Sequence, residues 1–294
     1  MSTPATLDTP GVWYFTDGMS AAEAATFAQR IEALGYSTLW LPETTGRDPF
    51  AHIAFLATET TALTFATGIA NIFHRHPGMM AQAANTVAEQ AGGRFILGLG
   101  VSHAPMVAGL RKLDYSHPLQ QMRDYLAGMD ASPCTAPLPP SPVPLLLAAL
   151  GPKMLALAAE QADGAHPYFS TPEHTALARQ ILGPDKLLCV EQKVVLSTDA
   201  TAARAAANAA IRIYAGLPNY RNNWIRLGFT DEEIERRDNR FVDAVVAWGD
   251  ESAIRARVQA HYDAGATHVC IQPLSTAGPR ELDWAALEAL APRP

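Results

Sequence analysis

The sequence predicts an α/β protein that folds as a (β/α)8 TIM-like barrel with insertions after strands 4 and 7. Short apolar runs alternate with helical patterns along most of the 294 residues. Each run is continuously apolar, which is typical of parallel strands covered on both faces. Eight strand–helix units fit a barrel of this length. A doubly wound sheet is the alternative, but its first turn is usually rich in glycine, and residues 16–19 are Thr-Asp-Gly-Met.

The first half of the chain holds four of these units. Strands are expected at residues 12–15, 38–41, 64–69 and 95–99. Ser20 and Glu23 form a capping-box pattern at the start of a helix, and Gly35 stands where a helix-ending glycine is expected. Another helix begins at Pro77 and ends at Gly92.

The second half repeats the pattern. Strands are expected at residues 145–149, 165–169, 187–196 and 267–272. Pro152 occupies the first position of a helix, which Gly164 is expected to end. Thr171 opens the next helix, which stops at Gly183.

Two longer stretches are predicted insertions. Residues 104–142 contain a helix near 118–129 and then a proline-rich segment that favours stiff extended chain. Residues 200–248 contain an alanine-rich helix, the polar segment 218–224 and a helix opened by Thr230. The polar segment either caps the site or forms a subunit contact. No domain boundary is evident, so residues 1–294 are expected to form a single domain.

Composition excludes several classes of protein. A hydrophobic content of 48% with only 17% charged residues excludes general disorder. A net charge of -7 argues against nucleic acid as a partner. The longest apolar run, residues 143–150, is far shorter than the roughly 20 residues of a membrane span. Met1–Pro4 lacks the features of a signal peptide, so a cytoplasmic protein is expected. Three widely spaced cysteines predict neither a disulfide framework nor a zinc site.

The most interpretable chemical motif is Leu150-Gly151-Pro152-Lys153, where a strand is followed by a helix. In a barrel, the active site lies at the carboxyl ends of the strands. A glycine lets the backbone approach a ligand, and a helix N-terminus attracts an anion by roughly 0.3–1 kcal/mol. With Lys153 as a point charge, the motif predicts a phosphate cradle. A plain turn with a solvated lysine is the alternative.

His103 is the candidate proton-transfer residue. It follows the fourth strand, and an imidazole titrates near neutrality. The neighbouring Ser102 is not in a Gly-x-Ser-x-Gly elbow, so a hydrolase nucleophile is not expected. His74 and His76 lack a carboxylate or cysteine to complete a metal site. His103 as an ordinary loop histidine remains the alternative.

Other residues at strand ends are expected to contribute to the pocket. Glu43 follows the second strand and either contacts a cofactor or starts a helix. Trp13, His166 and Tyr168 are expected to bind the substrate, although an aromatic residue in the first strand is also typical of a core.

Taken together, these motifs resemble a known family. They are, in order, residues 39–43 (LWLPE), 66–69 (ATGI), 76–77 (HP), 93–100 (GRFILGLG) and 149–154 (ALGPKM). This order and spacing resembles the luciferase-like monooxygenase superfamily, and within it the coenzyme F420-dependent oxidoreductases. The resemblance runs from residue 12 to about residue 275. It implies a TIM-like barrel, a homodimer and a flavin or deazaflavin bound at the strand ends.

The resemblance also implies site roles. Gly68 and Ile69 match the position of a non-prolyl cis peptide that backs the ring of the cofactor. Asn71 matches a residue that hydrogen-bonds this ring, and Glu43 matches an acidic cofactor contact. The remaining matches are the loop beside the ring (Val101, Ser102 and His103) and the loop that binds the cofactor phosphate (Ala149, Leu150, Gly151, Pro152, Lys153 and Met154).

One position departs from the family pattern. Sugar-phosphate dehydrogenases of this family carry a histidine directly after the acidic residue of strand two, where this chain has Thr44. The expected activity is therefore hydride transfer between coenzyme F420 and a small organic substrate, with His103 as the proton-handling group. Three alternatives remain: an FMN-dependent monooxygenase, a non-redox lyase or hydrolase acting on a phosphorylated substrate, and a non-catalytic cofactor-binding protein. The lyase needs a metal or a lysine at a strand end, and Lys193 lies inside the seventh strand.

Overall fold

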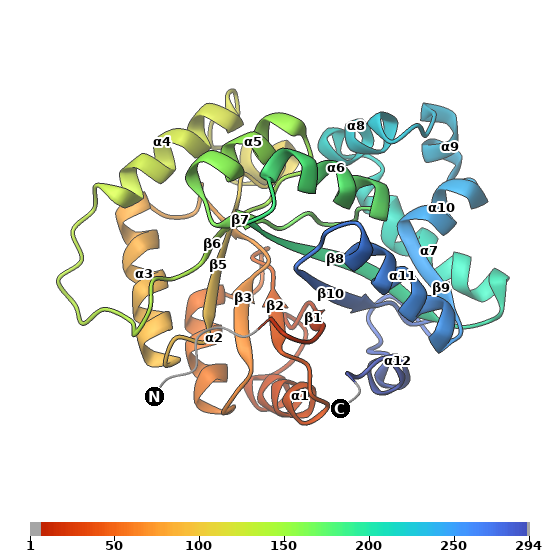
Figure 1. Ribbon diagram of the computed structural model, residues 1–294, viewed down its shortest axis with the longest axis horizontal. Helices are drawn as coiled ribbons and strands as arrows, with labels where there is room; N and C mark the ends of the chain where they lie inside the picture. The colour runs from red at the N-terminus through yellow and green to blue at the C-terminus, as the bar shows by residue number, and fades with distance from the viewer. Residues whose placement is uncertain (1–6, 293–294) are drawn as a thin grey trace.

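The computed structural model describes residues 7–292 and shows a closed barrel of eight parallel strands (Figure 1). Each strand pairs with its neighbour, and the last strand pairs with both the first and the seventh, which closes the sheet. The barrel prediction is therefore confirmed, and the doubly wound alternative is wrong. The barrel strands are β1 (Gly11–Trp13), β2 (Thr38–Leu41), β3 (Thr64–Thr67), β5 (Phe95–Gly100), β6 (Leu145–Leu147), β7 (Gly164–Ala165), β8 (Leu187–Leu196) and β10 (His268–Pro273).

Two further strands extend the barrel. β4 (Ala70–Asn71) pairs with β5 and follows the peptide bond between Gly68 and Ile69, which is cis. The strand expected at residues 64–69 therefore ends earlier, at Thr67, directly before the cis peptide. β9 (Val246–Gly249) pairs with the second half of β8 and was not predicted.

Helices surround the strands and begin where capping residues place them. Ser20 and Glu23 form the predicted capping box, and Gly35 has a φ of +85° behind the helix. The helices are α1 (Ala21–Ala33), α2 (Pro49–Thr58), α3 (Pro77–Gln90), the π-helix η1 (Pro105–Leu110), α4 (Pro118–Asp130), α5 (Pro152–Gln161), α6 (Pro172–Leu182), α7 (Ala200–Tyr214), α8 (Pro218–Arg226), α9 (Asp231–Arg236), α10 (Asn239–Val245), α11 (Glu251–Asp263) and α12 (Trp284–Ala289).

The structure corrects the predicted end of the helix that begins at Pro152. Gly164 does not end a helix, because α5 stops at Gln161 and Gly164 is the first residue of β7. A Cβ atom on Gly164 would lie 1.9 Å from the Leu187 carbonyl oxygen, so the glycine permits close contact between β7 and β8. The polar segment 218–224 belongs to helix α8, which starts at Pro218.

Both insertions are present. The first insertion follows β5 in the chain and consists of η1, α4 and the proline-rich segment 131–144. This segment forms a loop without helix or strand at the left of Figure 1. The second insertion follows β8 in the chain and consists of helices α7 to α10, which lie beside the barrel at the right of the same view. They share an apolar cluster with the end of β8, centred on Trp224 and Phe241.

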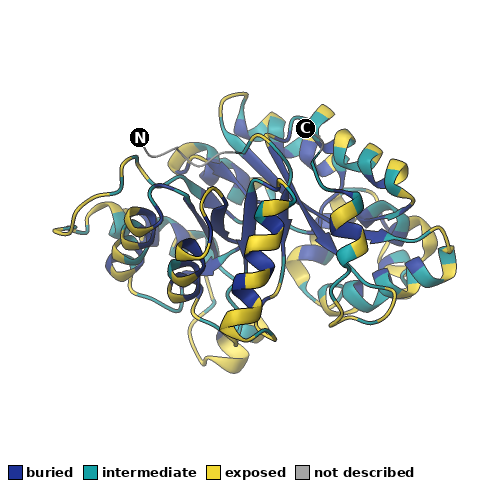
Figure 2. Cartoon of the chain, turned by 90° about the horizontal axis from the view of Figure 1, so that it is seen from below, coloured by how far each residue is buried: buried dark blue, intermediate teal, exposed yellow. Residues whose placement is uncertain are grey.

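The core follows the strands, which are buried on both faces, whereas the helices expose their outer sides (Figure 2). A ring of apolar side chains fills the inside of the barrel: Trp13, Trp40, Ala66, Ile96, Leu146, Cys189 and Cys270. Across residues 7–292, no helix is long and apolar enough to cross a membrane. The Met1–Pro4 segment lies outside the described residues.

Candidate active site

A cavity of about 510 Å³ opens at the carboxyl ends of the barrel strands. It is lined by segments that follow β1, β2, β3, β5, β6 and β7, together with α7 and α8. Among its lining residues are most of the predicted site residues: Trp13, Glu43, Gly68, Ile69, Val101, Ser102, His103, Ala149, Leu150, Gly151, Met154, His166 and Tyr168. The fold therefore brings the segment at Gly68 and the segment at Gly151 to one cavity.

Three predicted residues do not line this cavity. Asn71 is buried, and its side chain contacts His74 and accepts a hydrogen bond from the Phe73 amide. Pro152 and Lys153 are exposed in the first turn of α5. Their assigned contacts with a cofactor stay predictions.

Trp13 and Tyr168 form an aromatic part of the cavity wall. Their ring centroids are 4.8 Å apart, and the indole of Trp13 donates a hydrogen bond of 3.1 Å to the Gly68 carbonyl. A Cβ atom on residue 68 would lie 2.5 Å from this indole nitrogen, so the glycine is required by the close approach of Trp13. Trp13 thus holds the backbone at Gly68 against the inside of the barrel.

His166 is a buried residue that lines the cavity, and its tautomer is defined. Its Nδ1 lies 2.8 Å from the Cys189 carbonyl oxygen, which can only accept, so Nδ1 carries the proton. The other nitrogen, Nε2, is buried and has no hydrogen-bond partner in the described structure. The ring stacks on Trp40 with a centroid distance of 4.3 Å. Burial lowers the pKa of His166 to about 4, so the ring is neutral at neutral pH.

His103 lies at the cavity wall, where the β5 segment meets α8. Its ring is 5.5 Å from that of Tyr220, and its Nδ1 is buried without a hydrogen-bond partner in the described structure. Burial lowers the pKa of His103 below the ordinary value of 6.5, although the neighbouring Asn219 acts in the opposite direction. At neutral pH the imidazole is therefore a neutral group suited to accept a proton.

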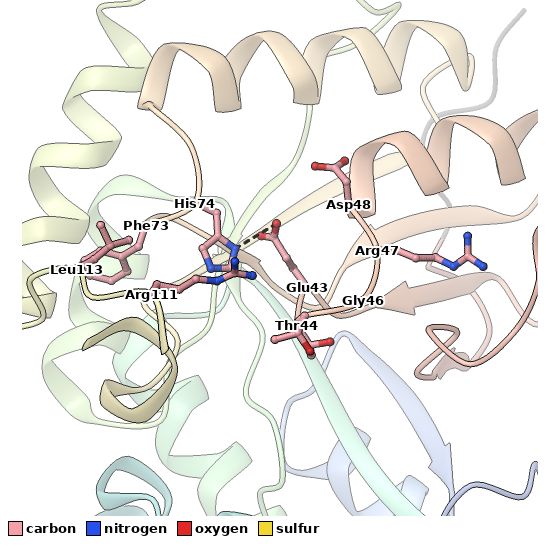
Figure 3. Close-up of a pocket in the computed structure, with 10 residues that line it drawn as sticks. Glu43, Thr44, Gly46, Arg47, Asp48, Phe73, His74, Arg111 and Leu113 are labelled. Carbon is pink, nitrogen blue, oxygen red and sulfur yellow. Dashed lines mark ion pairs between the residues drawn. The ribbon is translucent and has the colours of Figure 1, made fainter. Parts of the chain in front are cut away.

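Glu43 has internal partners for both of its carboxylate oxygens. Oε1 lies 3.3 Å from His74 (Figure 3) and 2.7 Å from Arg75. Oε2 accepts a hydrogen bond from the Asn71 amide. Its backbone amide donates to the Ile69 carbonyl. These bonds tie the end of β2 to the segment around the cis peptide. Glu43 therefore braces the cavity wall, and its direct contact with a cofactor stays a prediction.

A second cavity of about 390 Å³ adjoins the first and shares Glu43 and Thr44 with it. Figure 3 shows His74 and Arg111 on the same side of this cavity. This extension is polar and lies toward α2 and η1, away from α8.

The predicted phosphate cradle includes a cation that the sequence did not indicate. Gly151 caps α5 without a side chain, so no side-chain hydrogen bond closes the first turn. A Cβ atom on Gly151 would lie 3.7 Å from the Arg226 guanidinium, which lines the cavity and donates to Asn223. Arg226, rather than Lys153, is the cation placed at this helix N-terminus inside the cavity.

Sequence reasoning raised segment 218–224 as a possible cap but named no individual residue of the wall that α7 and α8 supply. These residues are Ile213, Tyr214, Leu217, Asn219, Tyr220, Asn222 and Arg226. The mixture of polar and aromatic residues in segment 218–224 was a signal, but only the packing of α8 shows that it faces the cavity. Segment 218–224 therefore lines the cavity, as expected for the first of the two roles raised from the sequence, a cap over the site.

A buried ion pair supports the aromatic wall from below. The ammonium of Lys193 lies 3.2 Å from Glu191 and 2.9 Å from Gln272, and 3.7 Å from the centre of the Tyr168 ring. Tyr168 donates a hydrogen bond to the same Gln272 oxygen. Within residues 7–292, no group of three histidine, cysteine, aspartate or glutamate side chains is arranged to hold a metal ion.

The site fits a ring-shaped cofactor that carries a phosphate. The cavity combines a largely apolar wall, an unpartnered acceptor at His166 and an uncapped helix N-terminus beside Arg226. Apolar walls with a few convergent polar groups are typical of cofactor sites. Gly151 and Arg226 would hold the phosphate, and the segments at Gly68 and Val101 would contact the ring.

Comparison with known proteins identifies the family. The model of the luciferase-like monooxygenase family matches residues 3–268, so the chain belongs to this family. Members of the family are enzymes that act as oxidoreductases or monooxygenases.

One sequence relative and two solved structures of the same fold have names that state a cofactor. A Mycobacterium tuberculosis protein, named as a coenzyme F420-dependent oxidoreductase, is 26% identical over 92% of this chain and 96% of its own. A solved F420-dependent secondary alcohol dehydrogenase, in complex with an F420–acetone adduct, has a TM-score of 0.76 at 15% identity, covering 96% of this chain and 97% of the other. The oxygenating constituent of 3,6-diketocamphane monooxygenase from Pseudomonas putida, in complex with FMN, has a TM-score of 0.71 at 15% identity, covering 96% of both chains.

Proposed function

We propose that this protein is an oxidoreductase that binds coenzyme F420 in the described cavity and uses it to exchange a hydride with a small organic substrate. The observation that carries the proposal is a single cavity lined by Gly68 and Ile69, by His103 and by Gly151 with Arg226. The similarity to the Mycobacterium tuberculosis oxidoreductase over nearly the full length of both chains supports the choice of coenzyme.

The coenzyme would supply the hydride chemistry. The chain would bind the coenzyme, orient its ring and accept the proton. Gly68, Ile69 and Val101 would position the ring beside His103. The N-terminus of α5 and Arg226 would bind the phosphate through backbone amides and a guanidinium. His103, neutral at neutral pH, would take the proton that leaves the substrate when the hydride is transferred.

The substrate would lie against the wall formed by α7 and α8. This part of the cavity presents Ile213, Tyr214, Leu217 and Tyr220, and its polar groups are uncharged apart from Arg226 at the phosphate end. The wall therefore favours a neutral organic molecule, and small alcohols are the first compounds to screen.

FMN-dependent oxygenation is the second candidate. A helix N-terminus with an arginine serves the phosphate of FMN as well as that of F420, and a solved neighbour of the same fold holds FMN. The lyase alternative has less support, because the ammonium of Lys193 is engaged by Glu191 and Gln272 and does not line the cavity.

Titration of the purified protein separates these candidates. The protein is titrated in parallel with coenzyme F420 and with FMN while the fluorescence of each ring is followed. We expect saturable binding of F420 that is tighter than that of FMN, followed by a change in ring absorbance when an alcohol substrate is added. Tighter binding of FMN would favour the monooxygenase, and binding of neither would rule out both. Light scattering on the same sample tests the homodimer, which we propose from the family resemblance alone.

A further inference from the structure

A residue that lines the cavity carries a buried hydrogen-bond acceptor that no group in residues 7–292 uses. This residue is His166, which is 1% exposed and whose Nε2 has no hydrogen-bond partner among the described residues. The Cys189 carbonyl accepts a hydrogen bond from Nδ1–H of His166. Nε2 therefore carries a lone pair rather than a proton. Burying a polar atom without a partner is unfavourable, which is a reason to look for its partner in a ligand.

Two contacts hold this acceptor in place. Stacking on Trp40 at an interplanar angle of 14° sets the plane of the ring, and the bond to the Cys189 carbonyl prevents the ring from flipping. The ring is neutral at neutral pH because it is fully buried, and the nearby positive charge of Lys193 acts in the same direction. His166 therefore presents a rigid, uncharged acceptor and cannot bind an anion through a charge.

We propose that His166 Nε2 selects ligands that place an uncharged N–H or O–H group beside it in the cavity. Two sources supply such a group: the imide N–H of a flavin or deazaflavin ring, and a hydroxyl or N–H of the substrate. This inference rests on the proposed function for its ligands, but it concerns a different contact from those at His103 and Gly151.

The test uses two substitutions at residue 166. His166→Phe keeps a flat ring against Trp40 and removes the acceptor, whereas His166→Gln offers an amide oxygen at a similar distance from the backbone. The matched control is His268→Phe, because His268 is also buried and stacks on Trp40 from 6.0 Å but does not line the cavity. Thermal unfolding of each variant establishes that it is folded.

Two binding measurements are made on each protein. The first is the dissociation constant of coenzyme F420 and of FMN by fluorescence titration. The second compares phenol with anisole, two neutral aromatic probes that differ in the O–H group, by calorimetric titration. A weakening of coenzyme binding by about tenfold in His166→Phe, recovered in His166→Gln, supports the proposal and identifies the ring imide as the donor. If coenzyme binding is unchanged in His166→Phe but the preference for phenol over anisole is lost, the proposal is supported and the donor belongs to the substrate.

The proposal is overturned if neither measurement distinguishes His166→Phe from the wild type, or if His268→Phe has the same effect. Should His166→Phe fail to fold, the wild type is tested with ligands that lack the donor, namely anisole and the N3-methyl derivative of the coenzyme that binds. Equal affinity for the methylated and unmethylated ligands in both pairs also overturns it. A wild type that binds a coenzyme while His166→Phe behaves identically refutes this inference alone, whereas a wild type that binds neither coenzyme refutes the proposed function.

Discussion

Lys193 and Glu191 form an ion pair of 3.2 Å inside the barrel, where the exposed fraction of both side chains is 1% or less. Burial raises the pKa of Glu191 and lowers that of Lys193 to about 8, so each shift opposes the charged form. The pair also contacts the wall of the cavity. The Lys193 ammonium lies 3.7 Å from the centre of the Tyr168 ring, and Glu191 accepts a hydrogen bond from the Phe169 amide.

Breaking this pair from one side is expected to destabilise the protein. Lys193→Met leaves a buried carboxylate without its partner, which typically costs about 3–5 kcal/mol. Adding Glu191→Gln removes the unpaired charge and keeps an acceptor for the Phe169 amide, so the double variant should regain part of the loss. Urea unfolding of the two variants checks this. A double variant no more stable than Lys193→Met would contradict the prediction.

His103→Ala is expected to reduce turnover by about 100-fold while changing coenzyme affinity little, because general base catalysis contributes to the reaction and not to coenzyme binding. The control is His117→Ala, which removes an exposed imidazole outside the cavity. Turnover is measured as coenzyme reduction by an alcohol found in the screen. Unchanged turnover in His103→Ala would remove this role.

The pH profile of the same reaction tests the protonation state of His103. Proton acceptance requires the neutral imidazole, so the rate should be constant near pH 7 and fall as the pH drops through the pKa of His103. Because burial lowers this pKa, the fall should be centred below pH 6.5. A rate that rises on acidification over that range would show that His103 acts in its protonated form.

Arg226 and Lys153 make a matched pair for the phosphate end of the cavity. Arg226→Ala is expected to weaken coenzyme binding by about 10- to 100-fold, because a charge-assisted hydrogen bond is worth about 1.5–3 kcal/mol. Lys153→Ala should change binding by only about twofold, since the side chain is exposed and does not line the cavity. Fluorescence titration with F420 measures both. A larger loss of coenzyme affinity in Lys153→Ala than in Arg226→Ala would show that Lys153 binds the phosphate.

The buried histidines predict a loss of stability in acid. Burial lowers the pKa of His166 to about 4 and those of His261 and His268 to about 3. In the unfolded chain these groups take up protons near pH 6.5, whereas in the folded protein they stay neutral to much lower pH. Unfolding therefore binds protons below pH 6.5, and the free energy of unfolding falls as the pH decreases toward 4.

Each histidine can contribute up to about 2 kcal/mol to this loss between pH 6.5 and 5, where one pKa unit corresponds to about 1.4 kcal/mol. Urea unfolding at pH 7 and at pH 5 measures it. The control is His268→Phe, whose pH dependence should be shallower than that of the wild type by one such contribution. Equal stability at both pH values would contradict the assignment of these groups as neutral and buried.

Local patterns predicted several strands and helix starts, whereas the strand expected at residues 165–169 shares only Ala165 with β7. The ranges 38–41 and 187–196 match β2 and β8, because continuous apolar runs suit strands buried on both faces. The capping box at Ser20 and Glu23 has the predicted hydrogen bonds, since its partners are three residues apart and need no distant contact. Gly164 misled the prediction because its role depends on β8, which is distant in sequence.

The sequence by itself determined the barrel, its two insertions and the strand ends at which a site must form, since hydrophobic periodicity and capping are local properties. Only the tertiary structure decided which side chains share the cavity. It placed Arg226 of α8 beside Gly151 and left Lys153 outside, and it paired both carboxylate oxygens of Glu43 within the chain. The reason is physical: the direction of a side chain at a loop or insertion depends on how distant elements pack, and no local pattern records that.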